Sequence, residues 1–162
     1  MKSSESSKSN KKYTTFFLML AVSFITMYIT MYLNTYALDH VYFSLTRFYM
    51  TCLGISVMSI VMLLFMLPMY TSKTKNRAIF AGSVLLFVTA LTLVRAQKPV
   101  IGDLLWLKAM IPHHSIAILT SERADIKDPE VKQLAEDIIK TQRKEIAEMK
   151  AMIQRLQEEK HE

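Results

Sequence analysis

The chain has 162 residues, of which 51% are hydrophobic and 21% are charged, and its formal net charge is +6. This apolar content is high for a water-soluble domain of such length, so it favours a membrane protein. Three glycines and four prolines are too few for a hairpin-rich β-sheet, and the single Cys52 excludes an intrachain disulfide. Because the cations cluster beside apolar runs, they indicate membrane orientation rather than nucleic-acid binding.

The N-terminal half predicts a short tail followed by membrane-spanning helices. Residues 1–12 are rich in serine and lysine and should form a disordered basic tail. Three long apolar runs follow, over residues 14–33, 48–70 and 78–94, and each can cross the hydrocarbon core of a bilayer as a helix. We therefore expect an all-α protein with a three-helix membrane domain over residues 13–98, in contact with the lipid bilayer.

The positions of the cations predict the orientation of this membrane domain. Four lysines precede the first span, and Lys73, Lys75 and Arg77 lie between the second and third spans, whereas the first connecting segment is close to neutral. By the positive-inside rule the N-terminus is cytoplasmic, and the chain emerges on the outer side after three crossings. Arg95 and Lys98 run against the rule, because they lie on the side that should be poor in cations.

Residues 99–162 are polar with a helical repeat and should form an extracytoplasmic helical hairpin. We expect the first helix from Asp103, as its N-cap, to about Arg123. The Asp-Pro-Glu sequence of residues 128–130 predicts the start of a second helix, which can run to about Glu159. Because two helices make a thin core, we expect two hairpins to associate into a four-helix bundle, or one hairpin to pack against a partner.

The sequence Met-Ile-Pro-His-His at residues 110–114 is the candidate functional site. Met110 precedes His113 by three residues and His114 by four, so a helix brings the thioether next to either imidazole. Soft sulfur with imidazole, and no cysteine, suits Cu(I) or Ag(I) better than magnesium, calcium or structural zinc. Pro112 should bend the helix there. In the competing interpretation His114 packs in the helix seam, His113 faces solvent and Met110 fills space.

Two further candidate ligands come from the second helix. Antiparallel pairing of the helices sets His114 opposite Ile138. Glu145 then lies about one turn further towards the membrane than the partner of Met110, and Met149 lies roughly 10 Å from the histidine level. Glu145 and Met149 would therefore need a nearer register, a second site or a second subunit, and a plain packing role for Met149 stays open.

The sequence gives no indication of enzymatic chemistry. It contains no metalloprotease helix motif, glycine-rich phosphate loop or nucleophile elbow. A di-iron bundle needs the Glu-x-x-His motif on two helices, and the only match runs from Glu158 to His161 at the frayed end of the second helix. We expect no enzyme activity.

Several of these stretches resemble a known family. The segment from Met110 to Ile126, the Asp-Pro-Glu-Val of residues 128–131 and the Glu-Ile-Ala-Glu-Met of residues 145–149 resemble a bacterial domain-of-unknown-function family with a ferritin-like helical fold. Residues 31–40 resemble its three-span membrane branch. The resemblance implies a bacterial inner membrane and, from copper-associated periplasmic relatives, ligands at the Met and His-His positions of the family. This chain lacks the additional Met- and His-rich segments of those relatives, which argues against high-capacity storage.

Two functional hypotheses follow. The first is a membrane-anchored protein that binds a soft metal ion, most readily Cu(I), for metal tolerance or delivery to a copper-handling partner protein. Its candidate ligands are Met110, His113, His114, Glu145 and Met149. The second is a structural or assembly protein whose hairpin docks onto a partner and binds no metal.

Overall fold

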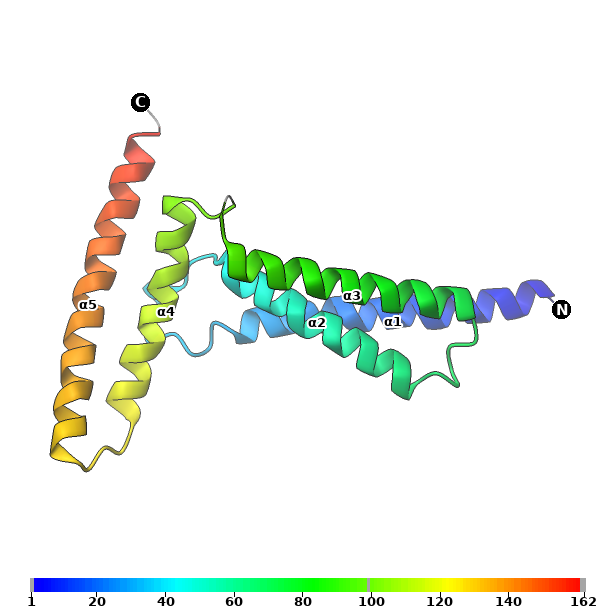
Figure 1. Ribbon diagram of the computed structural model, residues 1–162, viewed down its shortest axis with the longest axis horizontal. Helices are drawn as coiled ribbons and strands as arrows, with labels where there is room; N and C mark the ends of the chain where they lie inside the picture. Colours follow the sequence, from blue (N-terminus) through cyan, green and yellow to red (C-terminus); the bar gives the residue numbers. More distant parts are fainter. Residues whose placement is uncertain (1, 99, 161–162) are drawn as a thin grey trace. The chain divides into compact units, whose positions relative to one another are not determined.

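The computed structural model describes residues 10–98 and 100–160 and contains only helices there, with no strand (Figure 1). The all-α prediction is therefore confirmed. The predicted disordered tail lies largely outside the described residues, and its last residues, 10–12, belong to the first helix. The elements in chain order are α1 (Lys2–Thr30), the 3-10 helix η1 (Leu38–His40), α2 (Leu45–Phe65), α3 (Lys73–Ala96), α4 (Asp103–Arg123) and α5 (Pro129–Glu158).

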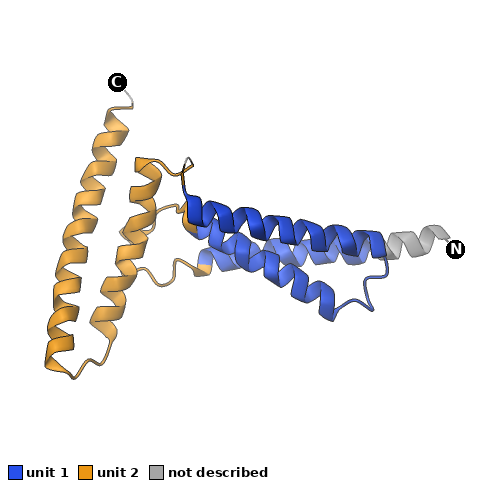
Figure 2. Ribbon diagram, viewed as in Figure 1, with its two compact units in different colours: residues 1–29, 47–97 blue, residues 30–46, 98–162 orange. Residues whose placement is uncertain are grey.

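The chain divides into two compact units (Figure 2). The membrane unit comprises residues 1–29 and 47–97, and the hairpin unit comprises residues 30–46 and 98–162. The sequence predicts a domain boundary between residues 98 and 99, and the contact units change between residues 97 and 98. They also assign residues 30–46, the connector between the first two spans, to the hairpin unit.

Three helices are long and apolar enough to cross a membrane, over Asn10–Thr30, Leu45–Phe65 and Lys73–Ala96. This finding fits the prediction of three spans. Helix α2 ends at Phe65, earlier than the apolar run predicts, with Pro68 in the turn that follows. Proline disfavours helical backbone at the residue before it, which accounts for the early end.

The helices of the membrane unit pack through an aromatic cluster and a buried polar pair. Phe16 meets Tyr70 edge to face, with ring centroids 5.3 Å apart. The Ser83 hydroxyl donates to Ser59 Oγ at 2.9 Å, and this buried hydrogen bond links α3 to α2. Three methionines from the end of α2 and the turn after it pack against the aromatic cluster: Met62, Met66 and Met69.

In the hairpin unit α4 and α5 lie antiparallel, joined by residues 124–128 (Figure 1). Asp128 caps α5 as predicted, because its carboxylate accepts the backbone N–H of Glu130 and Val131, both at 3.0 Å. The predicted capping role of Asp103 was wrong. Gly102 is the N-cap of α4, and Asp103 is the first helical residue, where its carboxylate faces the positive end of the helix dipole.

The core of the hairpin unit runs along the seam between α4 and α5. Its buried members are apolar residues that recur three, four or seven positions apart on each helix, as one helical face requires: Leu107, Ile111, Ile118, Ile146, Met149 and Ile153. Tyr36 and Tyr42 of the connector pack against this cluster. The connector therefore supplies part of the cover that two helices alone lack.

Candidate metal centre

His114 and Glu145 meet across the seam of the hairpin. The imidazole of His114 is 17% exposed, and its Nδ1 lies 3.1 Å from Oε2 of Glu145. The contact has the distance of an ion pair but not the alignment of a hydrogen bond, so Nδ1 is a buried nitrogen without a hydrogen-bond partner. Buried polar atoms in this state are uncommon and call for an explanation, such as a bound ion.

This pairing differs from the predicted register, in which His114 faces Ile138. Five non-helical residues, 124–128, separate α4 from α5. In addition, side chains on a helix lean towards its N-terminus, so those of His114 and Glu145 on antiparallel helices reach towards each other. Glu145 therefore reaches the histidine within one hairpin and needs no second subunit to do so.

The two thioethers lie one turn from this pair. Met110 precedes His114 by four residues, and Met149 follows Glu145 by four, so each shares a helix face with its neighbour. Because the helices are antiparallel, Met110, one turn before His114, and Met149, one turn after Glu145, lie at the same level of the hairpin. Met149 is 6% exposed in the core, and the half-buried Met110 packs against that core.

His113 is not brought into the seam. It is exposed, and its ring centroid lies 6.1 Å from that of His114, with the ring planes tilted by 59°. Consecutive helical residues point about 100° apart, which is why the two imidazoles diverge. The structure thus brings His114 and Glu145 together and leaves His113 on the solvent side.

The environment of His114 favours a neutral imidazole. Burial lowers the pKa of His114 below its ordinary value; the Glu145 carboxylate raises that pKa, and His113 lowers it further. The net pKa shift is downward, so this environment disfavours the charged form of the ring. Neutral imidazole is the form that ligates a metal ion.

The donor set of the seam is one imidazole, one carboxylate and two thioethers. Within residues 10–98 and 100–160, no three His, Cys, Asp or Glu side chains gather closely enough to hold a metal ion. Zinc, magnesium and calcium rely on those residue types, whereas thioethers select Cu(I). The residues present therefore fit a soft ion better than a hard or borderline one.

A neighbouring network ties the connector to α4, and reasoning from the sequence missed it. The Ser115 side chain is fully buried, and its Oγ accepts the backbone N–H of Tyr36 at 2.7 Å. His40 Nδ1 lies 3.0 Å from the same oxygen, whose remaining proton can be donated to it. Burial lowers the pKa of His40, while Asp39 raises it and Lys150 lowers it.

Two cations extend the attachment of the connector. The Arg143 guanidinium donates to the hydroxyl of Tyr36 at 3.2 Å and to Glu122 at 3.4 Å, and Lys150 forms an ion pair with Asp39. Ser115 directly follows His114, so these bonds hold the connector beside the candidate site. The bonds of the connector join residues that are 75 or more positions apart in the sequence, and no local pattern could have paired them.

Comparisons with known proteins cover this region. Residues 89–161 match a family described as "Domain of unknown function (DUF305)". The chain is also 35% identical over 140 residues to "Uncharacterized protein L153" of Acanthamoeba polyphaga mimivirus, an alignment that covers 84% of this chain and 89% of that protein. No solved structure matches the chain.

Proposed function

Since the chain belongs to the DUF305 family, a family of unknown function, we propose its role from its own residues: it binds a soft metal ion, most readily Cu(I), in the α4–α5 seam. One observation carries the proposal. The buried Nδ1 of His114 has no hydrogen-bond partner, and two thioethers lie one turn away at a common level of the hairpin. A soft cation there would satisfy the nitrogen and use sulfur ligands that few other ions favour.

The proposed roles follow from burial and charge. His114 binds the ion through Nδ1, and Met110 and Met149 supply sulfur. Oε2 of Glu145 lies 3.1 Å from the same Nδ1, so its carboxylate would balance the positive charge of the ion from the opposite helix. The exposed His113 acts as an entry ligand that receives the ion from solvent or from a copper-handling partner.

We propose further that the hairpin lies outside the cytoplasm and serves metal tolerance or delivery. The positive-inside rule supports the orientation, and three apolar helices provide the anchor. A bacterial inner membrane stays a prediction of the sequence. Self-association into a ferritin-like four-helix bundle is also proposed, with support from apolar residues of α5 that a lone hairpin leaves exposed, Val131 and Leu134.

The test is a Cu(I) titration of the full chain in detergent micelles, in competition with a chromogenic Cu(I) chelator. We expect His114→Ala to weaken binding at least about tenfold, since even groups that only support a ligand change metal affinity by that much. Met149→Leu, which keeps the side-chain volume but removes the sulfur, should also weaken binding. Met152→Leu is the matched control, because Met152 is exposed on the same helix.

The second candidate function is a structural one, in which the hairpin docks onto a partner without metal. The exposed apolar residues on α5 also favour this hypothesis. Cu(I) affinity that is unchanged in a variant carrying both His114→Ala and Met149→Leu would refute the metal hypothesis and leave the structural one.

A further inference from the structure

A groove in the hairpin unit contains none of the proposed metal ligands. It has a volume of about 460 Å³ and lies between the connector, α4 and α5. The buried Ile153 belongs to its lining, together with residues that carry amide, phenol or phenyl groups: Tyr42, Phe43, Gln154 and Gln157. The groove shares no residue with the metal site, so an inference about it does not depend on metal binding; it rests only on the proposed membrane crossings.

Two cations line the groove from opposite helices. Lys108 comes from α4 and Lys150 from α5. Lys150 forms an ion pair with Asp39, which also lines the groove. Lys108 makes no ion pair with a carboxylate among the described residues. The groove therefore has a net positive charge, and an anionic group is the complementary ligand.

The edge of the groove is apolar and close to a membrane span in the chain. Val41 and Phe43 line it and are 46% and 54% exposed. Phe43 is two residues before Leu45, the first residue of the apolar helix α2, and η1 begins with Leu38, which is 91% exposed. Exposed apolar side chains so near a span suit the boundary between lipid headgroups and acyl chains.

Two cations left unexplained by the positive-inside rule belong to the same side of the membrane. Arg95 and Lys98 follow the third span, and the connector follows the first span. Both segments are reached after an odd number of crossings, so they face the same leaflet. Anionic lipid in that leaflet would attract these cations along with Lys108 and Lys150.

We propose that this groove binds the headgroup of an anionic phospholipid from the leaflet next to the connector. Lys108 and Lys150 bind the phosphate, and the amides of Gln154 and Gln157 donate to polar groups of the head. The apolar edge of the groove contacts the upper part of the acyl chains. A free phosphate ion would leave this edge exposed. The ligand is therefore the lipid rather than phosphate from solution.

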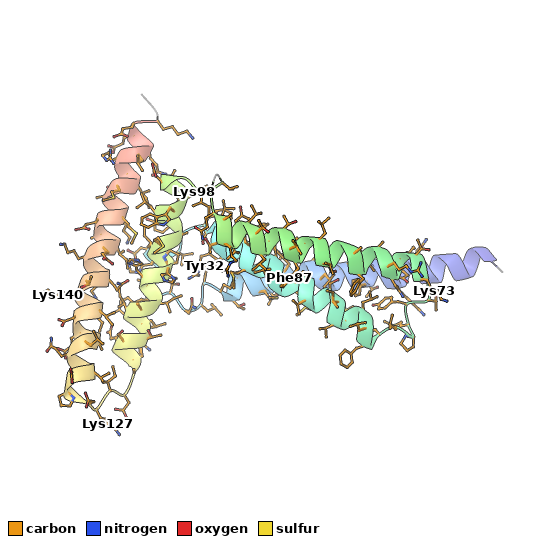
Figure 3. All side chains as sticks on the ribbon, viewed as in Figure 1. Tyr32, Lys73, Phe87, Lys98, Lys127 and Lys140 are labelled. Atoms are coloured by element: carbon orange, nitrogen blue, oxygen red, sulfur yellow. The ribbon has the colours of Figure 1, made fainter. Side chains whose placement is uncertain are left out.

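The test is native mass spectrometry of the full chain in detergent, with phosphatidylglycerol or phosphatidylcholine added. We expect the unchanged chain to bind phosphatidylglycerol more tightly than phosphatidylcholine. The Lys108→Gln variant should bind phosphatidylglycerol about fivefold more weakly, which is the affinity that one lysine contributes near an anionic surface. Lys140→Gln is the matched control, since Lys140 is exposed on the side of α5 away from α4 (Figure 3).

Further variants and a competitor make the outcome decisive. Lys108→Arg keeps the charge and should retain the preference for phosphatidylglycerol, and loss of the preference in this variant would overturn the charge-based account. The proposal also fails if both lipids bind equally well, or if Lys108→Gln binds phosphatidylglycerol as the unchanged chain does. Inorganic phosphate that competes as strongly as the lipid would overturn the assignment to a lipid.

Discussion

At the residue scale, the hydroxyl of Ser115 joins two parts of the chain, because it bonds to Tyr36 and His40 of the connector while fully buried on α4. Ser115→Ala leaves the backbone N–H of Tyr36 without its acceptor. A buried donor in that state costs about 1–3 kcal/mol. We expect faster amide hydrogen exchange across residues 30–46, measured by mass spectrometry on the full chain.

Ser121→Ala provides the control for this measurement. Ser121 lies on the same helix but is only half-buried, so its replacement should leave exchange in the connector unchanged. Equal protection of the connector in both variants would show that Ser115 does not hold it.

His114 should make the stability of the hairpin unit depend on pH. Burial lowers its pKa in the folded state, so the unfolded chain binds more protons wherever the two states differ. The contribution of His114 to stability is therefore complete above about pH 6.5, the ordinary pKa of histidine, and is lost as the pH falls through the folded pKa. An NMR titration of the histidine ring protons measures this pKa.

The Glu145→Gln variant tests how the Glu145 carboxylate affects the pKa of His114. The Glu145 carboxylate raises the pKa of His114, so its removal should lower that pKa further. A pKa of His114 that rises in the variant, or that exceeds the ordinary value in the unchanged chain, would contradict the buried position.

The candidate site was predictable only as far as local geometry reaches. Helical spacing places Met110 beside His114, and the structure keeps the pair on one face. The contact of His114 with Glu145 depends on the register of two helices, which in turn depends on loop geometry and the lean of side chains. The Ser115 network joins residues that are far apart in the sequence, and no local pattern in the connector or in α4 predicts this pairing.

At the element scale, the two helix ends that flank the hairpin loop were predicted well, whereas the start of α4 and the end of α2 were not. The first hairpin helix ends at Arg123 and the second begins at Pro129, as the Asp-Pro-Glu sequence predicts. The spans were predicted less closely, because apolar content falls gradually at their ends while a helix continues through polar residues. The packing of the connector was not predicted, since its mixed composition is equally typical of an exposed loop.

The cap of α5 provides a prediction at this scale. Asp128→Ala removes the acceptor for two backbone N–H groups of the first turn. We expect a loss of about 1 kcal/mol in the stability of that helix end, and a much smaller loss for Asp128→Asn, whose side-chain oxygen can still accept. Hydrogen exchange of residues 130–133 in the full chain measures both. Equal effects of the two variants would contradict the capping role.

At the scale of the whole molecule, the topology can be tested by cysteine labelling. Lys132 is exposed on α5, Thr71 is exposed between the second and third spans, and the native Cys52 is buried. In intact cells that express the chain, Lys132→Cys should react with a membrane-impermeant maleimide, whereas Thr71→Cys should react only after the cells are opened. The reverse pattern would invert the proposed orientation.

The two-part construction of the hairpin unit sets an order for its biosynthesis. The connector leaves the ribosome before residues 47–97 of the membrane unit, and Ser115 is translated only after them. The backbone N–H of Tyr36 and the ring of His40 therefore cannot bond to Ser115 until two long apolar helices, α2 and α3, have been synthesised. The unit closes only after most of the polypeptide has been made, so a nascent chain that stops before α4 cannot complete it.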